Sequence, residues 1–369
     1  MLSKHHALYM FVLLKCTLAQ TSGDCTIRGV YEAVTTREKI KKCTTLTFGN
    51  LAVPGGVQLD LSNLPGGMTL VFTGKIVFEC KEQDKNYLVL ISGKNVHITG
   101  TGGNSFDGNG ACYWEKKKAG GKKKPKFFLF HLVDSHVENL NVLNAPVHVF
   151  MISNCQNTLF NNIKIDNRAG DGLASNTDGF HVTESTDIVI RDCFVHNQDD
   201  CFTATSGKNI TFTGSTCEKG NGVSLGSIGN KATNDVSDVS LSNITIKNSL
   251  NGFRIKTVLN AVGSVSNVKV SDLILMNITD FGIVVRQDYL DAKGNVPQRI
   301  PTNGVTITNL TITNIYGTVS PTGQRTLEYC GTTSCSRWNW SNIHIQGGSE
   351  EGLAKCLNPP KESSGVKCI

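Results

Sequence analysis

Short runs of alternating polar and apolar residues recur along this chain. Each run is four or five residues long and rich in Val, Ile and Thr, and its period of two is that of a half-buried β-strand. The runs begin at residues 96, 162, 187, 209, 243, 268, 305, 310 and 342. Comparable units return about every 20 to 35 residues, and stretches of helical period are almost absent. The pattern predicts an all-β chain of many short strands.

The repeat interval selects among all-β architectures. A β-sandwich rarely extends beyond about 250 residues, and this chain has 369. A propeller would show a more regular blade period of about 40 to 50 residues. We therefore predict a single-domain right-handed parallel β-helix over residues 20–369. Each coil of such a solenoid buries its apolar row only against its neighbours, so the ends need caps, and the Cys-rich termini fit that need.

The first 19 residues have the features of a secretory signal peptide. Lys4 precedes an apolar run from Ala7 to Leu14, and a small residue, Ala19, follows close to the expected cleavage site. The run is too short to span a bilayer. Five Asn-X-Ser/Thr sequons agree with export. We expect a secreted, extracellular protein that does not associate with membranes.

The charge balance limits the possible partners. The chain has 36 Lys and Arg against 30 Asp and Glu, and loss of the leader lowers its formal charge from +6 to +4. This mild excess does not predict a nucleic-acid partner, but it permits an acidic one. The segment from Tyr113 to Lys126 carries seven lysines without alternation. It is either a solvated loop or a rim that attracts a polyanion.

Carboxylates and basic residues recur at the interval of a coil. Asp178 and Asp199 are 21 residues apart, and Asn221 follows Asp199 by 22. If coils stack at about 4.8 Å, these residues form a column on one face. Arg254 and Lys256 are two residues apart on a predicted strand, so their side chains share a face and could hold a carboxylate.

Asp199 and Asp200 are adjacent in the sequence. On a regular strand one of them would enter the core, where an unpaired carboxylate is costly. We therefore expect a bend or bulge that brings both to solvent.

These motifs, in this order and at these spacings, resemble those of the polygalacturonases of glycoside hydrolase family 28. The resemblance extends from about Cys25 to Cys368. It rests on residues 176–180 (Asn-Thr-Asp-Gly-Phe), 197–201 (Asn-Gln-Asp-Asp-Cys), 220–227 (Gly-Asn-Gly-Val-Ser-Leu-Gly-Ser) and 254–256 (Arg-Ile-Lys), with 286–289, 301–305 and 334–340 in support. It implies hydrolysis of α-1,4-linked polygalacturonan, the backbone of de-esterified pectin, by a monomer, with inversion and without a metal or other cofactor.

The resemblance also implies a division of roles. Asp199 would be the general acid, and Asp178 and Asp200 would activate water. Acid catalysis at neutral pH needs one carboxyl kept protonated beside ionised ones, and inverting enzymes commonly separate acid and base by about 6.5 to 9.5 Å. The substrate-binding residues implied by the resemblance are Arg254, Lys256, Asn176 and Gln198.

Three positions depart from the family pattern. Asn221 lies where the family has the His of Gly-His-Gly, and Asn cannot carry a proton or a positive charge. His181 replaces a usual Asp, and we interpret it as a structural histidine. Leu327 falls at the position of a sugar-stacking Tyr, with Tyr329 displaced by two residues. We expect a slow enzyme, or a pectin-binding protein that has lost catalysis. A calcium-dependent pectate lyase, which shares the architecture, is the third possibility.

Twelve cysteines remain after the leader, an even number in an oxidising compartment. The resemblance implies four disulfides: Cys25–Cys43, Cys201–Cys217, Cys330–Cys335 and Cys356–Cys368. The remaining four could pair as Cys155 with Cys193 and Cys80 with Cys112.

Overall fold

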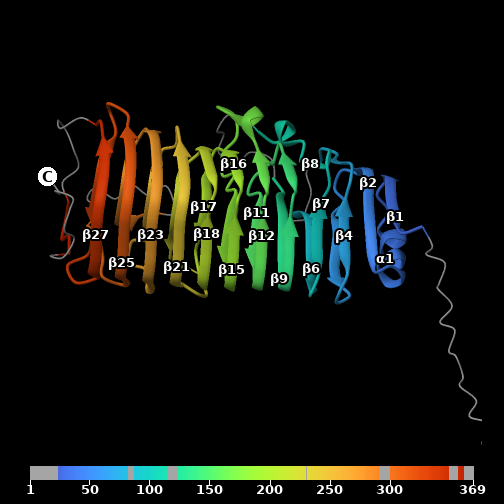
Figure 1. Ribbon diagram of the computed structural model, residues 1–369, viewed down its shortest axis with the longest axis horizontal. Coiled ribbons are helices and arrows are strands. Elements are labelled where there is room, and N and C mark those ends of the chain that lie inside the picture. Colours follow the sequence, from blue (N-terminus) through green and yellow to red (C-terminus); the bar gives the residue numbers. More distant parts are fainter. Residues whose placement is uncertain are drawn as a thin grey trace, which may run out of the picture.

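The computed structural model describes residues 24–81, 87–114, 124–229, 231–290, 300–348 and 356–360. The proposed signal peptide, most of the lysine-rich segment and Cys368 lie outside these residues. The described strands stack side by side in chain order along one long axis (Figure 1). Each pairing between them is parallel, as a right-handed parallel β-helix requires. The predicted fold class is confirmed.

The strands form three columns, each of which is a parallel sheet running along the solenoid. The first column comprises β3 (Leu59–Leu64), β6 (Tyr87–Lys94), β9 (Lys126–Glu138), β11 (Phe150–Ser153), β14 (Phe180–Thr183), β17 (Asp200–Ala204), β20 (Gly222–Ile228), β22 (Asn251–Val258), β24 (Phe281–Tyr289) and β26 (Gln324–Tyr329).

The second column comprises β1 (Thr26–Val30), β2 (Thr45–Val53), β4 (Thr69–Phe72), β7 (His97–Gly100), the end of β9, β12 (Gln156–Asn161), β15 (Ser185–Arg191), β18 (Gly207–Thr213), β21 (Asp235–Lys247), β23 (Gly263–Ile278), β25 (Val305–Val319) and β27 (Cys335–Gln346). The third comprises β5 (Lys75–Phe78), β8 (Ser105–Asp107), β10 (Asn141–Leu143), β13 (Lys164–Asp166), β16 (Phe194–Asn197) and β19 (Thr216–Lys219), and it joins the second at β21.

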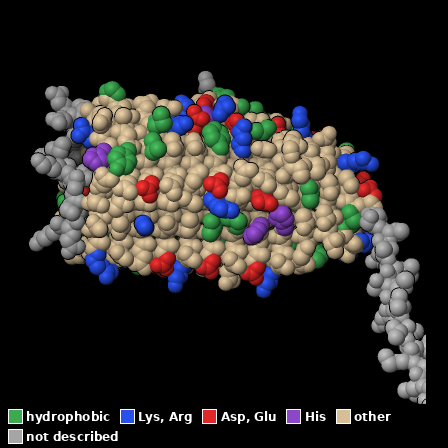
Figure 2. Space-filling view, viewed as in Figure 1, with side chains coloured by type: hydrophobic (Ala, Val, Ile, Leu, Met, Phe, Trp, Pro, Cys, Tyr) green, Lys and Arg blue, Asp and Glu red, His purple; other side chains and the backbone are tan. Residues whose placement is uncertain are grey.

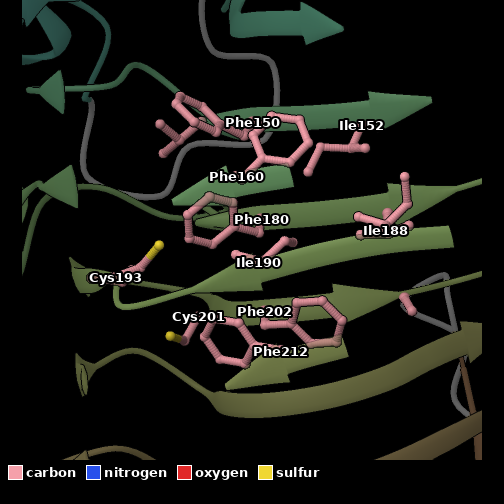
Figure 3. Packing of buried hydrophobic residues seen from close by; sticks show 14 of the residues in the cluster. Phe150, Ile152, Phe160, Phe180, Ile188, Ile190, Cys193, Cys201, Phe202 and Phe212 are labelled. Atoms are coloured by element: carbon pink, nitrogen blue, oxygen red, sulfur yellow. The ribbon is translucent and has the colours of Figure 1, made fainter. Parts of the chain in front are cut away.

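The core is a set of side-chain rows that run from coil to coil. Phe150 packs on Phe180 with ring centroids 5.4 Å apart, and Phe202 stacks on Phe212 at 4.9 Å (Figure 3). The alternation predicted from the sequence places such residues inside and polar residues outside, as in β18, where Ile210 and Phe212 are buried. On the face seen in Figure 2, exposed hydrophobic side chains are scattered among polar surface.

Asparagine and aspartate with left-handed backbone conformation recur within the strands of the second column. Asp187 and Asn209 both have positive φ, and the Asn209 amide donates to the Asp187 carboxylate at 2.7 Å. Asn and Asp tolerate the left-handed region better than other residues with a Cβ, and their side chains bond locally. The same contact recurs between other coils, as from Asn267 to Asp238 at 2.8 Å. Side-chain ladders of this kind keep successive coils in register.

The N-terminal end is covered by a helix that the sequence pattern did not predict. Helix α1 (Ala33–Lys42) lies beside β1 and β2 (Figure 1) and buries Thr36 and Ile40. A disulfide between Cys25 and Cys43 ties its end to the first coil. Among the described residues, no helix is long and apolar enough to cross a membrane.

Four disulfides join described residues. Cys25–Cys43, Cys201–Cys217 and Cys330–Cys335 form as expected, and so does Cys80–Cys112. The pairing of Cys155 with Cys193 is wrong, because both are buried free thiols. Cys155 packs in the second column against β9, whereas the Cys193 thiol donates to the carbonyl of Arg191. The expected partner of Cys356 lies outside the described residues.

Candidate active site

The predicted carboxylates and basic residues gather at the start of the first column. Asp178 lies two residues before β14, Asp199 precedes β17, Asn221 precedes β20, and Arg254 and Lys256 are in β22. These four strands are consecutive neighbours in the sheet. Residues from four successive coils therefore line one surface, as the coil-length spacing in the sequence predicted.

Two glycines shape the turn that presents Asn221. Gly220 and Gly222 both have positive φ, 62° and 81°. A Cβ on Gly220 would collide with the carbonyl oxygen of Asp199, and one on Gly222 with that of Asn251. The chain therefore needs glycine on both sides of Asn221, which brings the Asn221 side chain against the acid of the preceding coil.

Asp199 has its two oxygens in different surroundings. Its Oδ1 accepts 2.8 Å hydrogen bonds from the Asn221 side-chain amide and from the backbone N–H of Asp200. Its Oδ2 has only a 3.4 Å contact with the amide of Asn176. Burial, together with the negative charges of Asp178 and Asp200, raises the pKa of Asp199 to about 7. Because two donors are fixed on Oδ1, Oδ2 is the oxygen left available to hold a proton.

Asp200 is buried and paired with both basic residues. Its Oδ1 lies 2.6 Å from the Arg254 guanidinium and accepts a 2.8 Å hydrogen bond from Ser224. Its Oδ2 lies 2.9 Å from the ammonium of Lys256. Its side chain is only 2% exposed.

The expected departure from strand geometry is present, as a register shift between Asp200 and Phe202. The expectation that both acids reach solvent is wrong for Asp200. Two cations compensate its charge, so burial does not leave it unpaired.

Asp178 lies between two histidines. The Nδ1 atoms of His148 and His181 are each 3.7 Å from its Oδ2, and the imidazole rings stack with centroids 5.6 Å apart. Burial raises the pKa of Asp178, but His181, His148 and Lys256 outweigh it and lower that pKa to about 2. Burial lowers the pKa of His148 to about 4, so its ring is neutral near pH 7.

The three carboxylates lie close together. One oxygen from each of Asp178, Asp199 and Asp200 falls within 4.8 Å of the other two. A water molecule that forms hydrogen bonds of about 2.8 Å with two such oxygens holds them about 4.6 Å apart. The cluster thus has room for a water shared by two carboxylates, although its nearest oxygens are closer than the separation that an inverting mechanism predicts between whole carboxyl groups.

The remaining predicted residues hold the site from beside it. Gln198 donates to the backbone carbonyl of Asn167 at 2.8 Å and to the carboxylate of Asp171 at 2.9 Å, and it accepts from Thr177 at 3.0 Å. Its amide is occupied by these protein contacts. Asn176, with a φ of 57°, contacts Asp199 directly.

Sequence reasoning missed His148 and Ser224. His148 lies 30 residues before Asp178, which is the length of one long coil. It lies two residues before β11, which pairs with β14. Ser224 lies opposite Arg254 in the register of β20 and β22 and bonds both Arg254 and Asp200. The coil interval was the signal that could have found His148.

The surface beside the site is hollowed. Its lining includes Gln198, Asn221 and the backbone of Gly220, and it extends over the next coil to Asn248 and Leu250. Leu327 is buried in β26, opposite Val284, and Tyr329 pairs with Arg286. No aromatic ring is thus supplied at position 327, as the sequence indicated.

A half-buried carboxyl group with a raised pKa, beside a carboxylate with a lowered pKa and a third one held by two cations, lies on the outer face of this parallel β-helix, an arrangement suited to acid–base hydrolysis of a glycosidic bond. The chain belongs to glycosyl hydrolases family 28, whose sequence model matches residues 43–366.

Characterised relatives agree with that assignment. An endo-polygalacturonase of Sclerotinia sclerotiorum is 43% identical over 350 residues, covering 94% of this chain and 89% of its own length. A polygalacturonase of Penicillium griseoroseum is 40% identical, covering 96% and 93%. The solved structure of endopolygalacturonase I from Stereum purpureum, complexed with two galacturonate, matches with a TM-score of 0.73 and 30% identity, covering 87% of this chain and 95% of its own.

Proposed function

We propose that this protein hydrolyses α-1,4-galacturonosyl linkages of polygalacturonan and de-esterified pectin by inverting acid–base catalysis, at a rate reduced by Asn221. The polygalacturonase class is that of its relatives. The single observation that carries the mechanism is the contrast within one cluster: the pKa of Asp199 is raised to about 7 while that of Asp178 is lowered to about 2. Pairs whose surroundings separate their pKa values in this way mark acid and base.

Asp199 is the general acid in this proposal. Its Oδ2 carries the proton and points away from the two donors that hold Oδ1, so it can protonate the leaving glycosidic oxygen. A positioned general acid contributes about 10²- to 10⁴-fold to a rate. After proton transfer, the amides of Asn221 and Asp200 stabilise the carboxylate that forms.

Asp178 is the principal base that activates water. It is ionised at working pH and lies within 4.8 Å of the acid. Asp200 is the second water-activating residue, and its oxygens are paired with the Arg254 guanidinium and the Lys256 ammonium. We expect inversion, which proton NMR of the first products tests directly, because inversion releases the β-anomer from an α-linked chain.

Arg254 and Lys256 would bind a galacturonate carboxylate. Each retains part of its hydrogen-bonding capacity, since the Arg254 guanidinium has five N–H donors and the Lys256 ammonium three. Asn176 and Gln198 are the further substrate contacts that we propose. For Gln198 this requires exchange of one of its protein hydrogen bonds for a sugar hydroxyl.

Asn221 explains why we propose a reduced rate. It orients Asp199 through one hydrogen bond but cannot add positive charge, and the proton of Asp199 is therefore bound more tightly than beside an imidazolium. We further propose that the protein is secreted and monomeric, in keeping with its leader-like N-terminus and with the scattered apolar surface in Figure 2. The acidic polysaccharide is its partner, rather than nucleic acid or a membrane.

The presence of Asn221 also supports a second candidate, a pectin-binding protein without useful catalysis. The groove, Arg254 and Lys256 remain in either case. Purified protein incubated with polygalacturonic acid and assayed for new reducing ends separates the two, with Asp199→Asn as the inactive blank. Asp192→Asn makes the same chemical change at an exposed site, where the side chain is 58% exposed, and should leave activity unchanged.

Reducing ends above the Asp199→Asn level establish the hydrolase. Activity equal to that blank, with binding to polygalacturonic acid retained in affinity electrophoresis, establishes the binding protein instead. Calcium-dependent ultraviolet absorbance during digestion would show a lyase.

A further inference from the structure

The space between His148, Asp178 and His181 is lined by three potential metal ligands. Both Nδ1 atoms are buried and have no hydrogen-bond partner. Each stops 3.7 Å from Oδ2 of Asp178, beyond hydrogen-bond range. Their side chains are 20% and 12% exposed, and that of Asp178 is 9% exposed. Polar atoms left unpaired in this way cost free energy unless another group satisfies them.

A second contact engages the other ring nitrogen of His181. Its Nε2 lies 3.1 Å from the hydroxyl of Thr205, which is itself buried. If Nε2 carries the proton and donates it to Thr205, Nδ1 presents its lone pair to the shared space. Metal-binding histidines are commonly fixed in this manner by a hydrogen bond at the other ring nitrogen.

The distances suit a small metal ion after a minor adjustment. All three ligand atoms lie within 4.8 Å of one another. Bonds of about 2.0 to 2.2 Å in tetrahedral geometry put ligand atoms about 3.3 Å apart, so Oδ2 and each Nδ1 need to close by about 0.4 Å. His148 lies two residues before β11 and His181 lies in β14, and the pairing of these neighbouring strands fixes the spacing of the stacked rings.

The ligand set selects among metals. Two imidazoles and one carboxylate suit Zn²⁺, Ni²⁺ or Cu²⁺, whereas Ca²⁺ and Mg²⁺ prefer six or more oxygen ligands. Lys126 and Lys256 add positive charge near Asp178. An ion held there must gain from nitrogen ligation, which again disfavours calcium and magnesium.

We infer that His148 Nδ1, Asp178 Oδ2 and His181 Nδ1 form a binding site for one Zn²⁺-like transition metal ion, which inhibits hydrolysis by occupying the carboxylate oxygen that activates water. Three protein ligands leave the fourth position of a tetrahedral ion open. Binding of the ion is independent of the proposed function, whereas inhibition rests on it.

Metal binding is measured first on the full-length protein stripped with a chelator. Zn²⁺ is titrated by isothermal titration calorimetry, and Co²⁺ is added as a spectroscopic probe, since low-coordinate Co²⁺ with nitrogen ligands absorbs strongly in the visible range. We expect one saturable site. His148→Gln and His181→Gln should each weaken Zn²⁺ binding by at least about tenfold, and Thr205→Val should weaken it by about 10- to 100-fold through the lost hydrogen bond to His181.

His136→Gln is the matched control, because His136 is an exposed histidine on another face that packs near His97. Circular dichroism checks that each variant is folded. Saturable binding that survives both site substitutions but is lost in His136→Gln places the ion on the surface and overturns the inference, as does the absence of saturable binding. Turnover of metal-free protein is assayed separately, so an inactive protein that still binds Zn²⁺ at this site counts against the proposed function alone.

Discussion

The side-chain amide of Asn221 donates a 2.8 Å hydrogen bond to Oδ1 of Asp199. The backbone N–H of Asp200 donates to the same oxygen. An oxygen that already accepts two hydrogen bonds is poorly placed to carry a proton, so Oδ2 holds it. Asn221 thus orients the acid without exchanging protons with it.

Asn221→His should raise kcat on polygalacturonic acid and move the alkaline limb of the pH–rate profile to lower pH. An imidazolium beside Asp199 favours its ionised form and lowers its pKa from about 7. Reducing-end assays across a pH series measure both effects.

Asn248→His is the control for that substitution. Asn248 lines the same hollow but bonds Asn277 instead of Asp199. An equal gain in both variants would mean that the hollow, and not the acid, responds to histidine.

The activity of the natural protein should depend on pH through two carboxylates. Above pH about 7, Asp199 loses its proton and kcat/KM falls. At acidic pH the activity should persist well below pH 4, because Asp178 stays ionised down to pH about 2. A bell-shaped pH–rate profile with its alkaline limb near pH 4 would contradict the assignment of Asp199 as the acid.

Asp199→Asn should abolish activity but make the free energy of unfolding less dependent on pH. The pKa of Asp199 is raised from 3.8 to about 7 on folding. Its contribution to stability is therefore fully present below pH about 4 and is lost as the pH rises through about 7. The neutral amide does not ionise, so the variant should gain stability relative to the natural protein between pH 4 and 7.5.

Urea denaturation at those two pH values measures this gain. If the free energies of unfolding of the variant and the natural protein differ by the same amount at both pH values, Asp199 does not ionise with a raised pKa in the folded protein over that range.

Lys256→Met should destabilise the protein by about 3 kcal/mol or more, because it leaves Asp200 with one cation fewer in a buried position. The ammonium lies 2.9 Å from Asp200, and its side chain is 9% exposed. The double variant Lys256→Met with Asp200→Asn should recover much of this stability in urea denaturation but no activity. Equal losses in the single and double variants would argue against the ion pair as the cause.

Two thiols should be unreactive towards thiol reagents in the folded protein. Cys155 and Cys193 are buried and free, and burial raises the pKa of each to about 12. A thiol reagent should therefore react with neither until the chain is unfolded in denaturant without reductant, after which two equivalents should appear. Fewer than two would indicate that these cysteines are bridged after all.

The regular part of the fold could be predicted from the sequence. Runs such as Asn209 to Thr213 alternate because one face packs in the core and the other meets water. This contrast between adjacent residues can be read directly from the sequence. Among the strands that carry the site, β17, β20 and β22 do not alternate. β17 and most of β20 are buried on both faces, so no period of two marks them. Helix α1 was missed for a related reason: it buries only Thr36 and Ile40 and has a weak apolar stripe.

The sequence by itself also indicated most members of the candidate site. Asp178, Asp199, Asn221, Arg254 and Lys256 recur at coil-length intervals, and stacking of coils converts an interval in sequence into a contact in space. Only the tertiary structure decided which contacts each group makes there. The partners of Asp200, the two histidines around Asp178 and the free state of Cys155 depend on side-chain directions and on distances of a few ångströms. Such quantities are fixed by packing across coils, which no spacing along a single chain specifies.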